Sequence, residues 1–126
     1  MNRVLSLSFS LVLIILCGSS FAEQPRKNAS GGPAVTFVEL GSVNCIPCKA
    51  MQPVMKSIEQ KYKGKVKVVF YDVWTESGAP YARSYGIRAI PTQVFLDENG
   101  KEFFRHTGYY PEAEIDRLIR ARGIKP

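Results

Sequence analysis

Two short apolar runs flank an amphipathic helical pattern in the middle of this chain, and this arrangement restricts the fold more than any other feature. Residues 34–40 (AVTFVEL) and 66–71 (VKVVFY) are rich in β-branched and aromatic side chains, which is typical of buried strands. Between them, apolar residues from Met51 to Tyr62 recur at spacings of four, three and four, which is typical of a helix. This strand–helix–strand unit predicts two parallel strands joined by a right-handed crossover.

The later segments predict a short helix, a β-hairpin and a final helix. They are a helix at 79–85, strands at 92–96 and 102–106 around a turn at 97–100, and a helix that begins at Pro111. The pair Asn99-Gly100 is a strong hairpin-turn signal because both residues tolerate positive φ. The predicted order is therefore β-α-β-α-β-β-α. It describes an α/β protein with a mixed sheet and helices on both faces.

Composition limits the class of protein. The chain has 126 residues, 45% of them hydrophobic and 22% charged, and a formal net charge of +6. These values fit one ordinary globular domain, and they exclude a disordered chain, a large multi-domain enzyme and a polytopic membrane protein. The positive charge is not arranged as an aromatic-interleaved basic stripe, so we expect no nucleic-acid partner.

The first residues have the pattern of a signal peptide, which we predict at 1–22. Arg3 precedes a thirteen-residue, mostly apolar run, which is too short to favour a membrane-spanning helix. Ser20-Phe21-Ala22 then places small residues at the −3 and −1 positions of a cleavage site. Cleavage there predicts a secreted or periplasmic protein.

The cleaved chain would consist of a flexible leader at 23–33, rich in Gly, Pro and small polar residues, and a folded domain at 34–126. Two alternatives stay open for the N-terminal segment. It would act as an anchor if it were kept, and Cys17 would carry a lipid if the chain were a bacterial lipoprotein. The second alternative is less favoured because Leu16, which is not a small residue, precedes that cysteine.

The segment Cys45-Ile46-Pro47-Cys48 is the candidate reactive site, because it holds two cysteines three residues apart. Side chains at i and i+3 lie on one side of a helical turn, so modest adjustment brings the two sulfur atoms into disulfide range. At a helix start, free backbone N–H groups and the positive end of the dipole lower the pKa of the Cys45 thiol toward neutrality. Cys48, one turn further in, is expected to be more buried and protonated and to act second.

A CxxC pair has three other common uses. A haem-attachment motif is excluded because it requires His directly after the second cysteine, and Lys49 follows Cys48 here. A zinc site needs two more good ligands, and after cleavage at Ala22 only His106 remains as a further Cys or His. An inert structural disulfide is the third alternative. We expect neither a metal nor an organic cofactor.

With these features the chain resembles the thioredoxin superfamily over residues 34–122. The segment 85–92 (YGIRAIPT) is similar to the family segment that carries a cis-proline opposite the active site. Pro53, five residues beyond Cys48, matches a proline of the family's active-site helix. The strand–helix unit that precedes this core in full thioredoxins has no counterpart here, so the resemblance implies a four-stranded mixed sheet.

The resemblance implies a role for each site residue. Cys45 would attack a substrate disulfide and Cys48 would resolve the mixed disulfide. Pro91 would be cis, and the main chain of Ile90 would pair with an extended substrate segment. The residues between the cysteines, Ile46-Pro47, are assigned to the same substrate-binding surface.

These roles describe a monomeric thiol–disulfide oxidoreductase with protein disulfides as substrates. A proline directly before Cys48, as in reducing thioredoxins, favours a reductant. A reductant outside the cytoplasm needs electrons from inside, which implies a membrane thiol-transfer partner. An oxidase or isomerase, and a redox-inactive binding module whose CxxC is a metal clip or a structural disulfide, remain as alternatives.

The chain departs from the family pattern around the expected buried acid. Glu39 stands where the family typically has Asp, and Phe70 or Tyr71 falls where its basic partner would be. A buried carboxyl group without a cation has a raised pKa, which suits a proton acceptor for Cys48. Pairing of Glu39 with a surface lysine at the strand end is the alternative.

Two further departures concern aromatic side chains near the site. Asn44 replaces the tryptophan that usually precedes the first cysteine. Trp74, after the second predicted strand, either flanks the substrate groove or packs as a partly buried loop residue.

Overall fold

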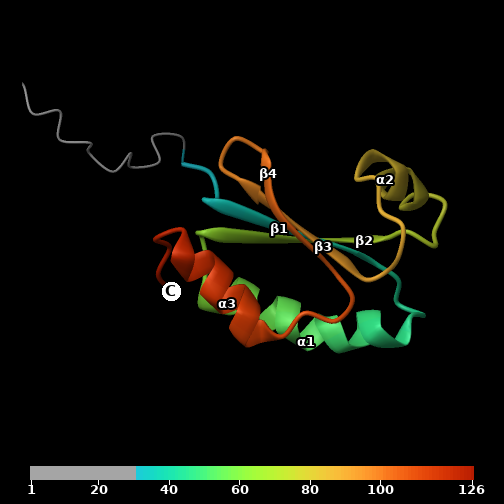
Figure 1. Cartoon of the computed structure of the whole chain (residues 1–126), viewed down its shortest axis with the longest axis horizontal. Coiled ribbons are helices and arrows are strands. Elements are labelled where there is room, and N and C mark those ends of the chain that lie inside the picture. Colours follow the sequence, from blue (N-terminus) through green and yellow to red (C-terminus); the bar gives the residue numbers. More distant parts are fainter. Residues whose placement is uncertain (1–30) are drawn as a thin grey trace, which may run out of the picture.

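The computed structural model describes residues 31–126, so the predicted signal peptide, the Cys17 alternative and most of the predicted leader lie outside the described residues. The elements are β1 (Val35–Gly41), α1 (Ile46–Lys61), β2 (Val66–Asp72), α2 (Ala79–Ser84), β3 (Thr92–Asp97), β4 (Glu102–Thr107) and α3 (Glu112–Ala121) (Figure 1). The order predicted from the sequence is confirmed. No helix within the described residues is long and apolar enough to cross a membrane.

The strands form a four-stranded mixed sheet in the order β2-β1-β3-β4 (Figure 1). β1 runs parallel to β2 and antiparallel to β3, while β3 and β4 form the antiparallel hairpin expected from Asn99-Gly100. The predicted sheet is therefore confirmed. β1, which leads directly into the CxxC segment, is a central strand with hydrogen-bonded neighbours on both sides.

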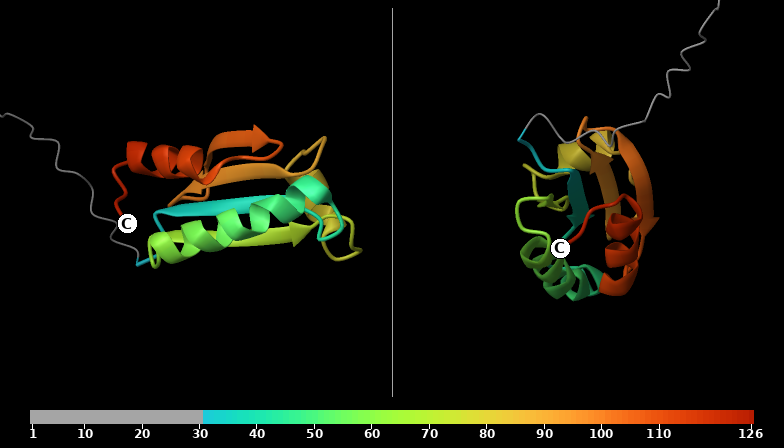
Figure 2. Two further views of the ribbon diagram at one scale, coloured as in Figure 1. Left: turned by 90° about the horizontal axis from the view of Figure 1, so that it is seen from below. Right: turned by 90° about the vertical axis from the view of Figure 1, so that its left-hand side faces the viewer.

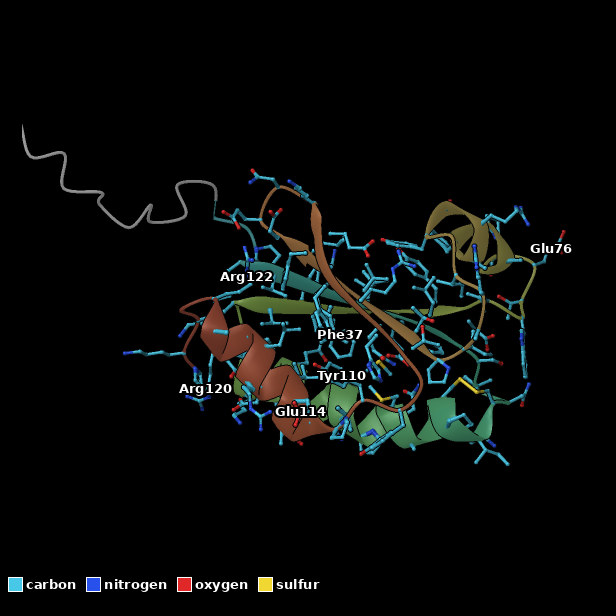
Figure 3. All side chains as sticks on the ribbon, viewed as in Figure 1. Phe37, Glu76, Tyr110, Glu114, Arg120 and Arg122 are labelled. Atoms are coloured by element: carbon cyan, nitrogen blue, oxygen red, sulfur yellow. A yellow bond between two sulfur atoms is a disulfide. The ribbon has the colours of Figure 1, made fainter. Side chains whose placement is uncertain are left out.

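Alternating residues of β1 build two apolar layers, one on each face of the sheet. Phe37 belongs to the core beneath α1 and α3, whereas Val38 and Leu40 belong to the cluster on the other face. Figure 2 shows α1 and α3 side by side on one face, with α2 on the other. Phe37 and Tyr110 lie between the sheet and these two helices (Figure 3). Helices therefore cover both faces, as predicted.

Candidate active site at the start of α1

Cys45 is the residue that caps the start of α1, and it is bonded to Cys48. The two cysteines form a disulfide with a Cα–Cα distance of 5.2 Å. The Cys45 backbone is extended (φ −94°, ψ 125°), and its Sγ accepts a hydrogen bond from the Cys48 backbone N–H at 3.3 Å. The sulfur thus occupies the place of an N-cap oxygen, where helix N–H groups favour negative charge.

The two sulfur-bearing residues differ in exposure in the order that the sequence predicted. Cys45 is 7% exposed and Cys48 is 0% exposed. The residue after Cys45, Ile46, is 83% exposed and projects beside the disulfide without being part of the core. A partner molecule can therefore reach Cys45 before it reaches Cys48.

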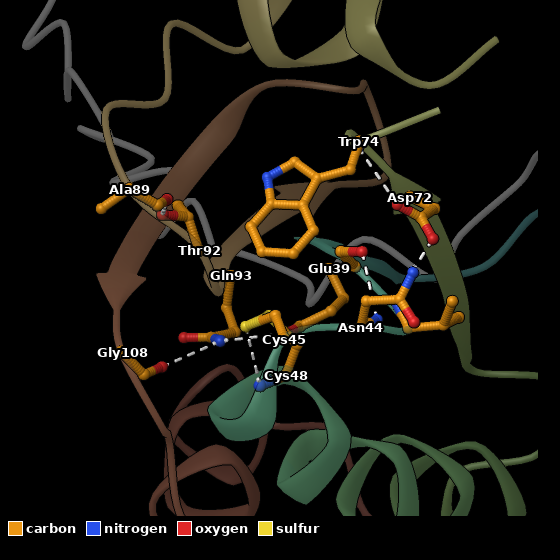
Figure 4. Close-up of a disulfide and its surroundings, with 12 residues drawn as sticks. Glu39, Asn44, Cys45, Cys48, Asp72, Trp74, Ala89, Thr92, Gln93 and Gly108 are labelled. Carbon is orange, nitrogen blue, oxygen red and sulfur yellow. Dashed lines mark hydrogen bonds between the residues drawn. A yellow bond between two sulfur atoms is a disulfide. The ribbon is translucent and has the colours of Figure 1, made fainter. Parts of the chain in front are cut away.

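A loop before β3 borders the site. The Ile90–Pro91 peptide bond is cis. The loop is held from both ends, because Thr92 Oγ1 donates to the Ala89 carbonyl at 2.8 Å and the Gly108 N–H donates to the Pro91 carbonyl at 2.8 Å. Figure 4 shows Ala89 and Thr92, which flank this peptide, in the surroundings of the disulfide.

Trp74 lies at the surface beside the site. Its side chain is 63% exposed, so the alternative of a partly buried loop residue is wrong. It lines an open groove of about 360 Å³ together with Val73, Ala82, Ile87, Arg88, Ala89 and Ile90. The groove therefore connects Trp74 with the residue that precedes the cis peptide bond.

Asp72, the last residue of β2, joins the loop after β1 to the loop after β2. One carboxylate oxygen accepts from the Val43 N–H at 3.2 Å and the other from the Trp74 N–H at 3.1 Å (Figure 4). These backbone donors, that of Val43 first, lower the pKa of Asp72. The loop that leads to Cys45 and the loop that carries Trp74 are thus tied to one carboxylate. Sequence reasoning did not single out this residue.

Glu39 is fully buried, and no lysine among residues 31–126 pairs with it, so the alternative of a surface ion pair is wrong. Its Oε1 accepts a hydrogen bond from Nε2 of Gln93 at 3.4 Å, and Phe70 stands opposite it on β2. Burial raises the pKa of Glu39 to about 8, while the hydrogen bond from Gln93 lowers it. The buried acid and its raised pKa agree with the expectation from the sequence.

The register of β1 places Glu39 on the face that carries Cys48. Residues two apart on a strand share a face, and Gly41 is two residues beyond Glu39. A Cβ atom at Gly41 would lie 3.2 Å from both Cβ and Sγ of Cys48. Glu39 therefore points into the layer between the sheet and α1, in which Cys48 lies.

Gln93 is the buried site residue that sequence reasoning missed. It is 0% exposed, stands directly opposite Glu39 in the β1–β3 register, and also donates to the Gly108 carbonyl at 3.1 Å. Its position in β3 relative to Phe95 could have indicated from the sequence that Gln93 is buried. It lies two residues before Phe95, a core residue beneath α1 and α3, so the strand period turns it inward.

Comparison with known proteins identifies the family. The model of the thioredoxin-like domain matches residues 22–123 of this chain. The chain belongs to the thioredoxin superfamily. A solved structure of a mutant thioredoxin from Halobacterium salinarum NRC-1 covers 72% of this chain with a TM-score of 0.63. The match is 23% identical and spans 76% of that protein's own chain, and it shows the fold.

Sequence relatives that are thioredoxins occur in distant organisms. Thioredoxin from Synechocystis sp. is 48% identical over 71 residues, which is 56% of this chain and 64% of that protein. Thioredoxin from Malassezia sympodialis is 35% identical over 85 residues, which is 68% of this chain and 79% of that protein. Thioredoxins are thiol–disulfide oxidoreductases, the enzyme class expected from the CxxC pair. The chain is thus a thioredoxin-like redox protein with a Cys45–Cys48 disulfide.

Proposed function

We propose that this protein reduces disulfide bonds of other proteins outside the cytoplasm, with Cys45 and Cys48 as the reacting pair. The observation that carries the proposal is the position of Cys45 at the start of α1. Its sulfur accepts the Cys48 N–H, and Cys45 is the more exposed of the two cysteines. A sulfur in this position is stabilised as a thiolate, which is the nucleophile in disulfide exchange.

In the first step, the Cys45 thiolate attacks one sulfur of the substrate disulfide. The bond between the substrate sulfurs breaks, a mixed disulfide forms on Cys45, and the other substrate sulfur leaves as a thiolate. In the second step, the Cys48 thiolate attacks the Cys45 sulfur and releases the second substrate thiolate. The substrate gains two electrons, and the enzyme is left with the disulfide that the structure contains.

Glu39 is proposed as the group that takes the proton from Cys48 in the second step. Cys48 is fully buried, so water has little access to its thiol. The carboxyl group of Glu39 has a pKa of about 8, which is near that of a free thiol. Proton transfer between groups of similar pKa has a small free-energy cost in either direction.

Substrate segments are proposed to bind across the exposed surface around Cys45. Ile46 and Pro47 would contact the residues next to the substrate cysteine. The main chain of Ile90, before the cis bond to Pro91, would pair with the extended substrate backbone. The groove beside Trp74 would accept an apolar side chain of the same segment.

The reducing direction, the location and the partner complete the proposal. Pro47, directly before Cys48, favours reduction, and the signal-peptide pattern at 1–22 favours a secreted or periplasmic protein, which we propose to be a monomer. Electrons would then come from a membrane thiol-transfer protein. Oxidase activity would use the same two steps in reverse, whereas an isomerase would form the mixed disulfide on Cys45 and be released by another thiol of the same substrate.

Reduction of insulin disulfides tests this proposal. Cys45→Ser is expected to abolish turnover, because no thiolate remains to attack. Cys48→Ser is expected to accumulate a mixed disulfide that a non-reducing gel detects. Turnover by the Cys45→Ser variant at the unsubstituted rate would contradict the proposal. Stoichiometric zinc or copper in the purified protein would instead support the metal-clip alternative.

A further inference from the structure

Beneath the disulfide, two buried polar side chains face each other across neighbouring strands. Glu39 and Gln93 are paired residues in the antiparallel β1–β3 register, and both are 0% exposed. Both lie on the sheet face covered by α1 and α3, as shown by their phase with Phe37 and Phe95. Figure 4 shows the Gln93 side chain between Glu39 and Gly108 in the surroundings of the disulfide.

The amide of Gln93 fixes one side of the Glu39 carboxyl group. Its Nε2 donates to Glu39 Oε1 at 3.4 Å and to the Gly108 carbonyl at 3.1 Å, so both amide hydrogens are used. Within residues 31–126, Glu39 Oε2 and Gln93 Oε1 are buried without a hydrogen-bond partner. Buried acceptors without donors are costly and are uncommon in folded proteins.

The free oxygen of Glu39 has a suitable donor once the disulfide is reduced. Reduction places a thiol hydrogen on Cys48, which contacts Gly41, on the same face of β1 as Glu39. We propose that Gln93 is a positioning residue for the resolving step, which holds Oε1 of Glu39 so that Oε2 can accept the Cys48 proton. This inference rests on the proposed function and assigns a role to a residue outside the CxxC and cis-proline segments.

The other titratable groups around the pair are few. Cys48 of α1 lies over the face of β1 that carries Glu39, His106 stands opposite Gln93 on β4, and Tyr110 stacks on His106 from the loop before α3. None of the ion pairs within residues 31–126 includes Glu39. Gln93 is therefore the hydrogen-bond donor that most directly controls the ionisation of Glu39.

The two chemical steps can be separated with a small aromatic disulfide that releases a coloured thiolate. The reduced protein attacks it through Cys45 and releases one coloured thiolate, then resolves through Cys48 and releases a second. Stopped-flow absorbance gives both rates as a function of pH. Gln93→Met keeps the approximate volume of the side chain and removes both amide donors.

Gln93→Met is expected to leave the first phase unchanged and to slow the second phase roughly ten-fold at pH 7, because a hydrogen bond to a charged group is worth about that factor or more. In the wild type the hydrogen bond from Gln93 lowers the pKa of Glu39, so its removal should raise that pKa. The midpoint of the pH profile of the second-phase rate should therefore move upward by about one pH unit. His106→Gln, a control at the neighbouring titratable group, should leave this midpoint unchanged.

A double-mutant cycle shows whether Gln93 acts through Glu39. In the Glu39→Gln background, Gln93→Met should slow the second phase no further. Equal slowing in both backgrounds, equal slowing of both phases, or an unchanged second-phase midpoint would overturn the inference. If reduced wild-type protein gives no first phase, the proposed function fails instead.

A milder variant covers the case in which Gln93→Met does not fold. Gln93→Asn keeps an amide in the buried layer but shortens its reach by one methylene group. We expect a smaller effect in the same direction, again confined to the second phase. A second phase identical to that of the wild type would overturn the inference.

Discussion

The buried carboxyl group of Glu39 gives the fold a pH dependence that one substitution should remove. Burial raises the pKa of Glu39 from 4.5 to about 8. The folded protein therefore keeps the proton up to about pH 8, whereas the unfolded chain releases it near pH 4.5. Ionisation in this range stabilises only the unfolded chain, so the free energy of unfolding falls as pH rises from about 4.5 to about 8.

Glu39→Gln removes this ionisation and retains a side chain that can accept from Gln93 and donate to its unpaired oxygen. Each pH unit in the window corresponds to about 1.4 kcal/mol. The difference in unfolding free energy between the variant and the wild type should therefore grow by about 3 kcal/mol from pH 5 to pH 7, in favour of the variant.

Urea unfolding of the oxidised proteins at these two pH values measures the difference. Glu59→Gln is a matched control, because Glu59 is an exposed acid on α1, and it should follow the wild type at both pH values. Wild-type and Glu39→Gln stabilities that change in parallel between pH 5 and pH 7 would refute the reasoning.

Two other substitutions test the packing and the charges that support the site. Gly41→Ala places a Cβ atom 3.2 Å from Cβ and Sγ of buried Cys48. The free energy of unfolding measured in urea should fall by about 1–3 kcal/mol, and an unchanged urea midpoint would contradict this close contact. Asp116 accepts hydrogen bonds from Lys61 and Tyr62, which hold its pKa well below the usual range. The free energy of unfolding of Asp116→Asn should therefore be about 2 kcal/mol lower than that of the wild type at pH 7. This difference should shrink as pH falls below about 4, because protonation of Asp116 removes the stabilisation from the wild type. A difference in stability that does not depend on pH would contradict these hydrogen bonds to the ionised carboxylate.

Much of the fold could be predicted because local patterns and tertiary packing agree. The β-branched and aromatic run at 34–40 contributes Val35 and Phe37 to the core, and the helically spaced residues from Met51 to Tyr62 lie in the same core. The hairpin followed from Asn99-Gly100, since a turn of this kind depends on only two residues. The CxxC pair could likewise be placed at a helix start, because it lies between the predicted strand at 34–40 and the helical spacing that begins at Met51.

The parts that could not be predicted depend on contacts between residues far apart in the chain. Glu39 and Gln93 are 54 residues apart, and the β1–β3 register that pairs them is set by the whole sheet. The same holds for Asp72, which joins Val43 to Trp74 through side-chain geometry that has no local sequence pattern. The sequence predicts a buried carboxyl group at Glu39 without a basic partner, but it does not identify the amide of Gln93 as the hydrogen-bond donor to that group.

Cys45 and Cys48 are expected to form a reversible two-electron couple, and a redox titration tests this most directly. Thiol labelling of the protein across a series of glutathione buffers should show one two-electron transition between dithiol and disulfide. A reductant should have a midpoint near the roughly −270 mV of thioredoxin rather than the roughly −120 mV of a strong oxidase. A midpoint near the oxidase value would contradict the reducing direction, and the absence of any transition would contradict the couple itself.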